Sequence, residues 1–177
     1  MLPKPDLEGI VLRLEDPFHG TEEALGTLKS SNLTGLADVQ QYARRLMDVY
    51  QTVTGRIDKA LEQARARGQT VIDQYSEYPQ PHNADVLKID VREKLRDVEY
   101  EAESIRNEIP KRLQQELANN YVDVRASFGH VIFKTHEGTY GIDLNEPDKG
   151  IREAVPVRIF GLEGYLLKKK NISHSRK

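Results

Sequence analysis

The sequence predicts an α+β protein: a long helical hairpin or coiled-coil-like bundle, followed by a small antiparallel β-meander of four to five strands. Apolar residues recur at steps of three and four over residues 36–64 and again over 91–117, and at steps of two from residue 122. The first period is typical of amphipathic helices and the second of half-buried strands. The two periods follow one another along the chain, so helices and strands are expected to be segregated.

These patterns divide the 177 residues into four parts. Residues 1–20 are expected to form an extended N-terminal arm, because prolines at 3, 5 and 17 oppose regular structure. Residues 21–119 form the helical hairpin or bundle, and residues 120–170 the antiparallel β-module. Residues 171–177 form a basic flexible tail.

The helical part begins with a short helix that Thr21 is expected to cap, and continues in a long helix over residues 34–67. The long helix carries an unbroken stripe over four heptads. Its members are Leu36, Val39, Ala43, Leu46, Tyr50, Val53, Ile57, Ala60 and Ala64. Arg67 and Gly68 interrupt the stripe, and the helix is expected to stop there or to resume through Val71 and Tyr75.

A second long helix is predicted from about Asn83 to Asn119, antiparallel to the first. Its apolar positions again alternate by four and three, at Val91, Leu95, Val98, Ala102, Ile105 and Ile109. One alternative and one irregularity are expected within this helix. Residues 86–91 also alternate as a strand would, and Pro110 is expected to kink the helix.

Alternation from residue 122 predicts strands near residues 122–128, 131–136, 139–144, 155–159 and 165–169. Glu137 and Gly138 are expected to form a two-residue hairpin loop, which places Phe133 opposite Ile142. That register gathers the apolar side chains on one face. Turns are expected at residues 129–130 and 161–164.

The sequence lacks the arrangements that enzymes use. It contains no cysteine, no HExxH pair of histidines, no GxSxG nucleophile turn and no glycine-rich phosphate loop. We therefore expect a non-enzymatic protein without a cofactor. The weak exception is a divalent-metal hydrolase using Asp143, Glu146 and Asp148, an acidic group for which a solvated turn is the better account.

The leading functional hypothesis is a protein-interaction or assembly module: an adaptor, a structural subunit or an inhibitor of a larger machine. A stripe this wide favours contact with a protein partner or with a second copy, as a homo-oligomer. The expected interface residues are Leu36, Val39, Leu46, Tyr50, Val53, Ile57 and Leu61. Long helices before a small meander also occur in assembly proteins and phage accessory proteins, which is an analogy of architecture alone.

The alternative hypothesis is a nucleic-acid-binding accessory protein that uses the outer face of the sheet and the basic tail. Its expected contacts are Arg125, Lys134, His136, Arg158, Lys168, Lys169 and Lys170. The formal net charge of −2 gives no global attraction to nucleic acid or membrane. Without cysteine, an apolar run of membrane-spanning length or a leader-like N-terminus, the sequence predicts a cytoplasmic protein with no membrane partner.

Overall fold

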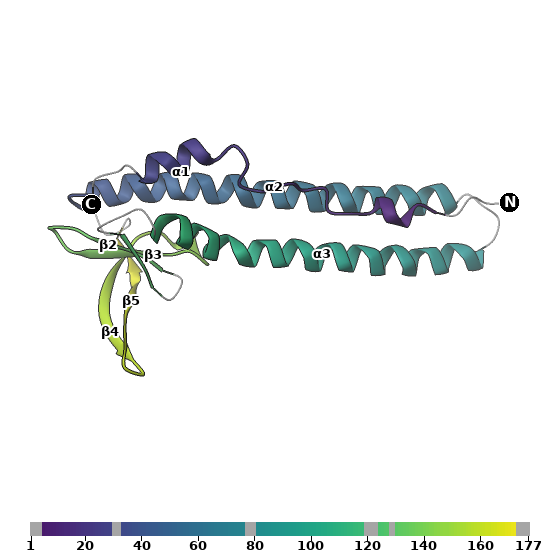
Figure 1. The fold of residues 1–177 in the computed structure, drawn as a ribbon. Helices are drawn as coiled ribbons and strands as arrows, with labels where there is room; N and C mark the ends of the chain where they lie inside the picture. The colour runs from purple at the N-terminus through teal and green to yellow at the C-terminus, as the bar shows by residue number, and fades with distance from the viewer. Residues whose placement is uncertain (1–4, 30–32, 77–80, 119–123, 128–129, 173–177) are drawn as a thin grey trace. The chain divides into compact units, whose positions relative to one another are not determined.

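The computed structural model describes residues 5–29, 33–76, 81–118, 124–127 and 130–172. Its helices are α1 (Glu22–Lys29), α2 (Leu36–Ser76) and α3 (Pro81–Ala118), with 3-10 turns η1 (Leu7–Gly9) and η2 (Pro147–Lys149). Its strands are β1 (Val124–Ser127), β2 (His130–Lys134), β3 (Thr139–Asp143), β4 (Arg152–Ile159) and β5 (Leu162–Asn171). Long helices thus precede an antiparallel sheet, and the predicted α+β class is confirmed (Figure 1).

The chain forms two compact units that interleave along the sequence. The first contains Met1–Pro17 and Val53–Asn107, and the second contains Phe18–Thr52 and Glu108–Lys177. Both long helices therefore belong partly to each unit. These boundaries differ from the four consecutive parts expected from composition.

In the first unit, the second half of α2 packs against the first part of α3. The heptad stripe continues beyond the expected stop, since α2 runs unbroken through Gly68 to Ser76. A Cβ at Gly68 would lie 3.1 Å from the side chains of both Val91 and Leu95, so glycine lets the two helices approach closely. The residue expected to end the helix instead sits at the helix–helix contact.

Most of the expected N-terminal arm, up to Pro17, belongs to this unit. Ile10 is fully buried, and ion pairs join Asp6 to Arg67 at 3.8 Å and Glu8 to Lys94 at 3.7 Å. The arm is largely irregular, apart from the turn η1. Burial of apolar side chains anchors it, since exposed ion pairs contribute little.

Helix α3 begins at Pro81, two residues before the expected cap, and residues 86–91 are helical. Proline suits the first position of a helix, because its missing N–H would lack an intrahelical partner there. Its fixed φ also matches the helical value. Pro110 lies inside α3, and the helix continues beyond it to Ala118.

In the second unit, the first part of α2 lies on one face of the sheet. Tyr42 on α2 and Phe133 on β2 meet edge to face, with ring centroids 5.0 Å apart. Val131, Tyr140 and Ile142 are buried on the same face of the sheet. Such aromatic and aliphatic packing supplies most of the stability of this core.

The N-terminus of α2 is tied to the loop between β2 and β3. The amide of Leu36 donates to a Glu137 carboxylate oxygen at 3.0 Å, and a Cβ at Gly35 would lie 2.8 Å from the same carboxylate. Next to it, the hydroxyl and amide of Thr34 both donate to Asp38, which holds the pKa of that carboxyl below its usual value. Carboxylates are favoured here by the unpaired N–H groups and the helix dipole.

The five strands follow the order β1-β2-β3-β4-β5, all antiparallel. The predicted hairpin register is wrong by two residues: Phe133 pairs with Tyr140 rather than with Ile142. The loop has four residues, because the Thr135 hydroxyl accepts from the amides of Glu137 and Gly138, and Thr135 pairs with Gly138 inside the loop. A shift of two preserves the face of each residue, so the predicted apolar face survives.

Two predicted turns are also corrected. His130 is the first residue of β2 and lies opposite Asp143, while Gly129 is outside the described residues. The second turn consists of Phe160 and Gly161, so β5 begins at Leu162, inside the segment expected to turn. Residues 173–177 of the expected basic tail are outside the described part of the chain.

Candidate interaction surface

Strands β4 and β5 form a two-stranded ribbon that extends beyond the other strands (Figure 1). Strand β3 pairs with β4 only at Glu153 and Arg152, so no described strand pairs with β4 on that side beyond Ala154. We call residues 154–167 the β4–β5 ribbon. It is held by its own cross-strand pairs, from Ala154 opposite Leu167 to Ile159 opposite Leu162.

The end of the ribbon is a two-residue turn with an unusual occupant. Phe160 has a φ of 50° and Gly161 a φ of 78°. Two positive φ values match the twist of the flanking strands, and Asn-Gly is the preferred pair for such a turn. A bulky residue such as phenylalanine is strained in this region of φ. The turn therefore carries backbone strain that asparagine would largely avoid.

One face of the ribbon turns back onto the sheet. A Cβ at Gly141 would collide with the side chain of Leu167, so glycine makes room for β5 to lie over β3. The Lys134 ammonium lies 5.7 Å from the centroid of the Tyr165 ring. These contacts cover the outer face of the central strands, where the fully buried Ile132 lies.

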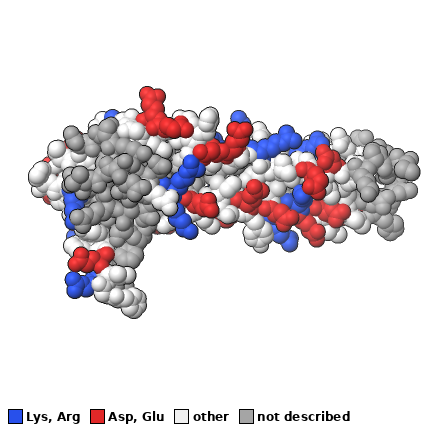
Figure 2. Space-filling model, viewed as in Figure 1, with Lys and Arg blue, Asp and Glu red and all other residues white. Residues whose placement is uncertain are grey.

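The opposite face of the ribbon is largely exposed among the described residues. The register places Val155 opposite Leu166 and Val157 opposite Gly164, with Leu162 on the same face. We call Val155, Val157, Leu162 and Leu166 the open face. The exposed fractions are 38% for Val155, 65% for Leu162 and 53% for Leu166, and Phe160 at the turn is 100% exposed. Figure 2 shows the end of the ribbon as largely uncharged, beside a small group of acidic and basic side chains.

The heptad residues expected to form an interface occupy a different environment. Leu36, Val39, Leu46, Val53, Ile57 and Leu61 are all at most 6% exposed within the single chain, and Tyr50 is half-buried. These side chains form the cores of the two units. A partner could reach them only if the chain opened, so the exposed apolar surface of the ribbon is the better candidate.

Two of the residues expected to bind nucleic acid lie beside acidic side chains. Arg158 pairs with Glu163 at 3.3 Å, and Lys168 pairs with Glu153 at 2.6 Å. Lys134 lies against Tyr165, as described above.

Two of these residues are exposed, and the side chains of two others lie outside the described part of the structure. His136 is exposed in the β2–β3 loop, since β2 ends at Lys134, and Lys169 is exposed on β5. The side chains of Arg125 and Lys170 are outside the described part of the structure. Among the described candidates, Arg158 and Lys168 each lie beside an acid.

The acidic candidates for a metal site are divided among other contacts. Asp143 accepts from the amide of Asn145 at 2.9 Å, and Glu146 pairs with Lys149 at 2.8 Å. Asp148 lies on the turn η2. Among the described residues, no three histidine or acidic side chains gather as a metal site would require.

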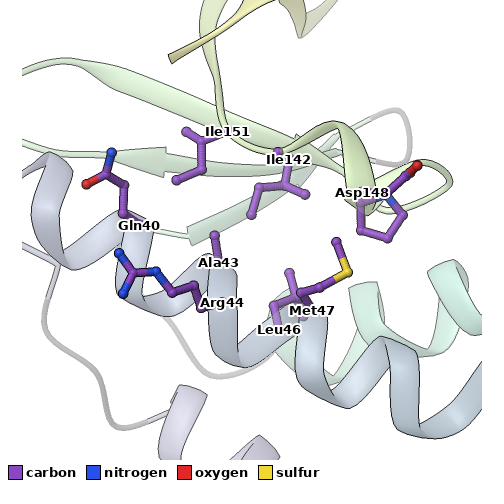
Figure 3. A pocket seen from close by; sticks show the side chains of 10 residues that line it. Gln40, Ala43, Arg44, Leu46, Met47, Ile142, Asp148 and Ile151 are labelled. Carbon is purple, nitrogen blue, oxygen red and sulfur yellow. The ribbon is translucent and has the colours of Figure 1, made fainter. Parts of the chain in front are cut away.

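A cavity of about 310 Å³ lies between α2 and the sheet (Figure 3). Its walls are mainly apolar, and Met47, Ile142 and Ile151 contribute to them. Figure 3 shows Gln40 and Arg44 at one end and Asp148 at the other. The volume is at the lower limit for ligand sites, and the lining contains no serine, histidine or cysteine to act as a nucleophile or base. The cavity has room for a small apolar group.

A second exposed apolar group lies on α3. Val86, Ile89 and Tyr100 are 57%, 54% and 70% exposed. Helical spacing places them within one face of α3, but charged residues separate Ile89 from Tyr100. They are scattered rather than contiguous, which is normal for a protein surface.

Comparison with models of known protein families, with curated proteins and with solved structures yields no match. None of the helices in the described part of the chain has an apolar stretch long enough to cross a lipid bilayer. The functional argument therefore rests on the site alone.

Sequence reasoning missed the open face because it read residues 161–164 as a turn. The signal was present: Val155, Val157, Leu162 and Leu166 belong to two alternating runs, and Phe160-Gly161 separates them by two residues. A two-residue turn at Phe160 and Gly161 places all four on one face. Their exposure depends on the absence of a covering helix, which no local pattern reveals.

Proposed function

We propose that this protein is a non-enzymatic interaction and assembly module whose contact surface is the open face and turn of the β4–β5 ribbon. The observation that carries the proposal is the exposure of Phe160, fully in solvent, next to Leu162 and Leu166. Contiguous exposed apolar surface of this kind marks interaction sites in soluble proteins. Phenylalanine is also among the residues enriched at protein interfaces.

The backbone at Phe160 supports this reading. Its φ of 50° is costly for a bulky residue, and its ring is fully exposed. Strained residues concentrate at functional sites, where surrounding structure maintains them. In a complex, contacts made by the Phe160 ring would offset the free-energy cost of this backbone conformation, which nothing offsets in the free chain.

Charge favours a protein partner over nucleic acid. Arg158 and Glu163 are the charged residues of segment 154–167, and they cancel. Binding to nucleic acid depends on many unneutralised cations, since phosphate contacts supply most of the affinity. The ribbon instead has an apolar face with balanced charge on the other face.

The proposal is tested by comparing Phe160→Asn with Tyr100→Gln, which removes an exposed aromatic from α3. Each protein is used as bait in extract from the source cells, and its mass is measured by light scattering. We expect Phe160→Asn to lose associations that the wild type and Tyr100→Gln retain. Equal associations for all three would refute the proposal. Salt-sensitive retention of labelled DNA or RNA by all three would favour the nucleic-acid alternative.

A further inference from the structure

We propose that the ribbon's partner is a second copy of this chain, with the open faces of two ribbons packed together around a two-fold axis. This inference rests on the function proposed above and names the occupant of its surface. A two-fold contact uses the same patch on both copies, so the patch must complement itself in shape and charge. Aliphatic side chains on one face of the ribbon can meet this requirement.

The exposed area agrees with a small dimer. The fractions for Val155, Phe160, Leu162 and Leu166 amount to roughly two and a half fully exposed large apolar residues, or about 500 Å² at ~200 Å² each. Two copies would then bury about 1,000 Å², where specific interfaces begin. Interfaces of this size are typical of weak, reversible association.

The charge on the ribbon also permits self-contact. Segment 154–167 has one arginine and one glutamate, and they pair on the face opposite the open face. At the base of the open face, Glu153 and Lys168 form a second balanced pair. Two such surfaces meet without net repulsion, whereas a strongly acidic or basic partner would gain no attraction from this surface.

Sheet packing supplies the geometry. The inner face of the ribbon is covered near its base, through Leu167 and Tyr165, and carries the exposed Arg158–Glu163 pair toward the turn, while the open face has no cover among the described residues. An isolated two-stranded ribbon is marginally stable in water. Packing against a copy would make a four-stranded sandwich, in which alternating side chains of both ribbons interdigitate about 10 Å apart.

The absence of cysteine makes a direct test possible, because a single introduced cysteine can form a disulfide only with another copy. Val157→Cys places the thiol near the middle of the open face. Arg158→Cys, one residue later, places it on the opposite face and serves as the matched control. Full-length proteins are mixed with a mild oxidant at about 100 µM, and disulfide dimers are followed with time; that concentration suits a weak interface.

We expect Val157→Cys to form dimers at least about ten-fold faster than Arg158→Cys, because disulfides require Cβ atoms within about 4.5 Å. We also expect the double variant Val157→Cys, Phe160→Asn to lose this advantage. Equal rates for the two single variants would overturn the inference.

The failure of the inference can be separated from failure of the proposed function. Equal cross-linking rates, together with a protein captured by the wild type and lost by Phe160→Asn, would reject the second copy and retain an interaction module. Equal rates with no association sensitive to Phe160→Asn would reject both. A Val157→Cys advantage that Phe160→Asn abolishes supports both.

Discussion

Replacing Phe160 by asparagine is expected to stabilise the β4–β5 ribbon of the free chain. The φ of 50° at Phe160 lies in the left-handed region, which costs an ordinary residue about 1–2 kcal/mol. Asparagine tolerates this region and is the preferred residue at this position of the turn. Because the Phe160 ring is 100% exposed, its removal loses no burial. The expected gain is about 1 kcal/mol.

The assay is amide hydrogen exchange across β4 and β5 at a concentration where the chain is monomeric. A gain of 1 kcal/mol slows exchange about five-fold wherever the ribbon opens as a unit. If the ribbon unfolds together with the rest of the chain, the midpoint of thermal unfolding rises by about 2–4 °C. Association through the ribbon falls at the same time, so stability and binding change in opposite directions.

Gly161→Ala in the same turn provides a control of opposite sign. Gly161 has a φ of 78°, and an added Cβ would meet nothing within 4 Å, so the change costs only backbone energy, about 1–2 kcal/mol. Faster exchange in Phe160→Asn than in wild type would refute the reasoning. That result would mean that the ring stabilises the free chain.

Three further predictions concern the helices. Gly68→Ala should lower the free energy of unfolding in urea by about 1–3 kcal/mol through overpacking against α3. Gly55→Ala, which has open space around its Cβ, should raise that free energy by about 0.5–1 kcal/mol. Shifts of the same sign for the two variants would contradict this prediction. Glu137→Ala should lower the free energy of unfolding by about 1 kcal/mol by removing the cap of α2, and Glu137→Gln should lower it by less. Equal losses for the two variants would exclude a capping role. The hydrogen bonds from Thr34 lower the pKa of Asp38 in the folded chain. The stabilisation from Asp38 is therefore present above its ordinary pKa near 3.8 and is lost as pH falls through the lowered pKa. Asp38→Asn should flatten the acid-side slope of stability against pH in unfolding titrations, and an unchanged slope would refute this role.

The helices could be predicted because their determinants are local. The steps of three and four locate the buried stripes of α2 and α3 without knowledge of the partner face. The sequence leaves open whether the helix stops at Gly68 or resumes, because Arg67 takes the next core position and Gly68 follows it. In the structure a close approach to α3 more than twenty residues away decides its role, and one sequence cannot reveal that contact.

The sheet, like the helices, could be predicted only in part from the sequence. Period-two alternation predicts which side chains share a face, but the register depends on bonds that the alternation does not encode. Thr135 closes a four-residue loop with its hydroxyl, and Glu137 in that loop reaches the N-terminus of α2. The predicted two-residue loop would have used Glu137 as a turn residue. The exposed ribbon likewise follows from tertiary packing, in which Leu167 lies over Gly141 and leaves the other face open.

The interleaving of the two units has a consequence for the newly synthesised chain. The segment Phe18–Thr52 belongs with Glu108–Lys177, so its apolar side chains leave the ribosome well before the strands that cover them. Contacts between such distant segments form slowly, and apolar surface that waits for its cover is prone to aggregation. The first unit can close once Asn107 has emerged, before the strands of the second unit have been synthesised. A chain cut after residue 107 would retain the helical hairpin and leave Leu36–Val49 without its sheet, and we expect such a fragment to aggregate or to recruit chaperones.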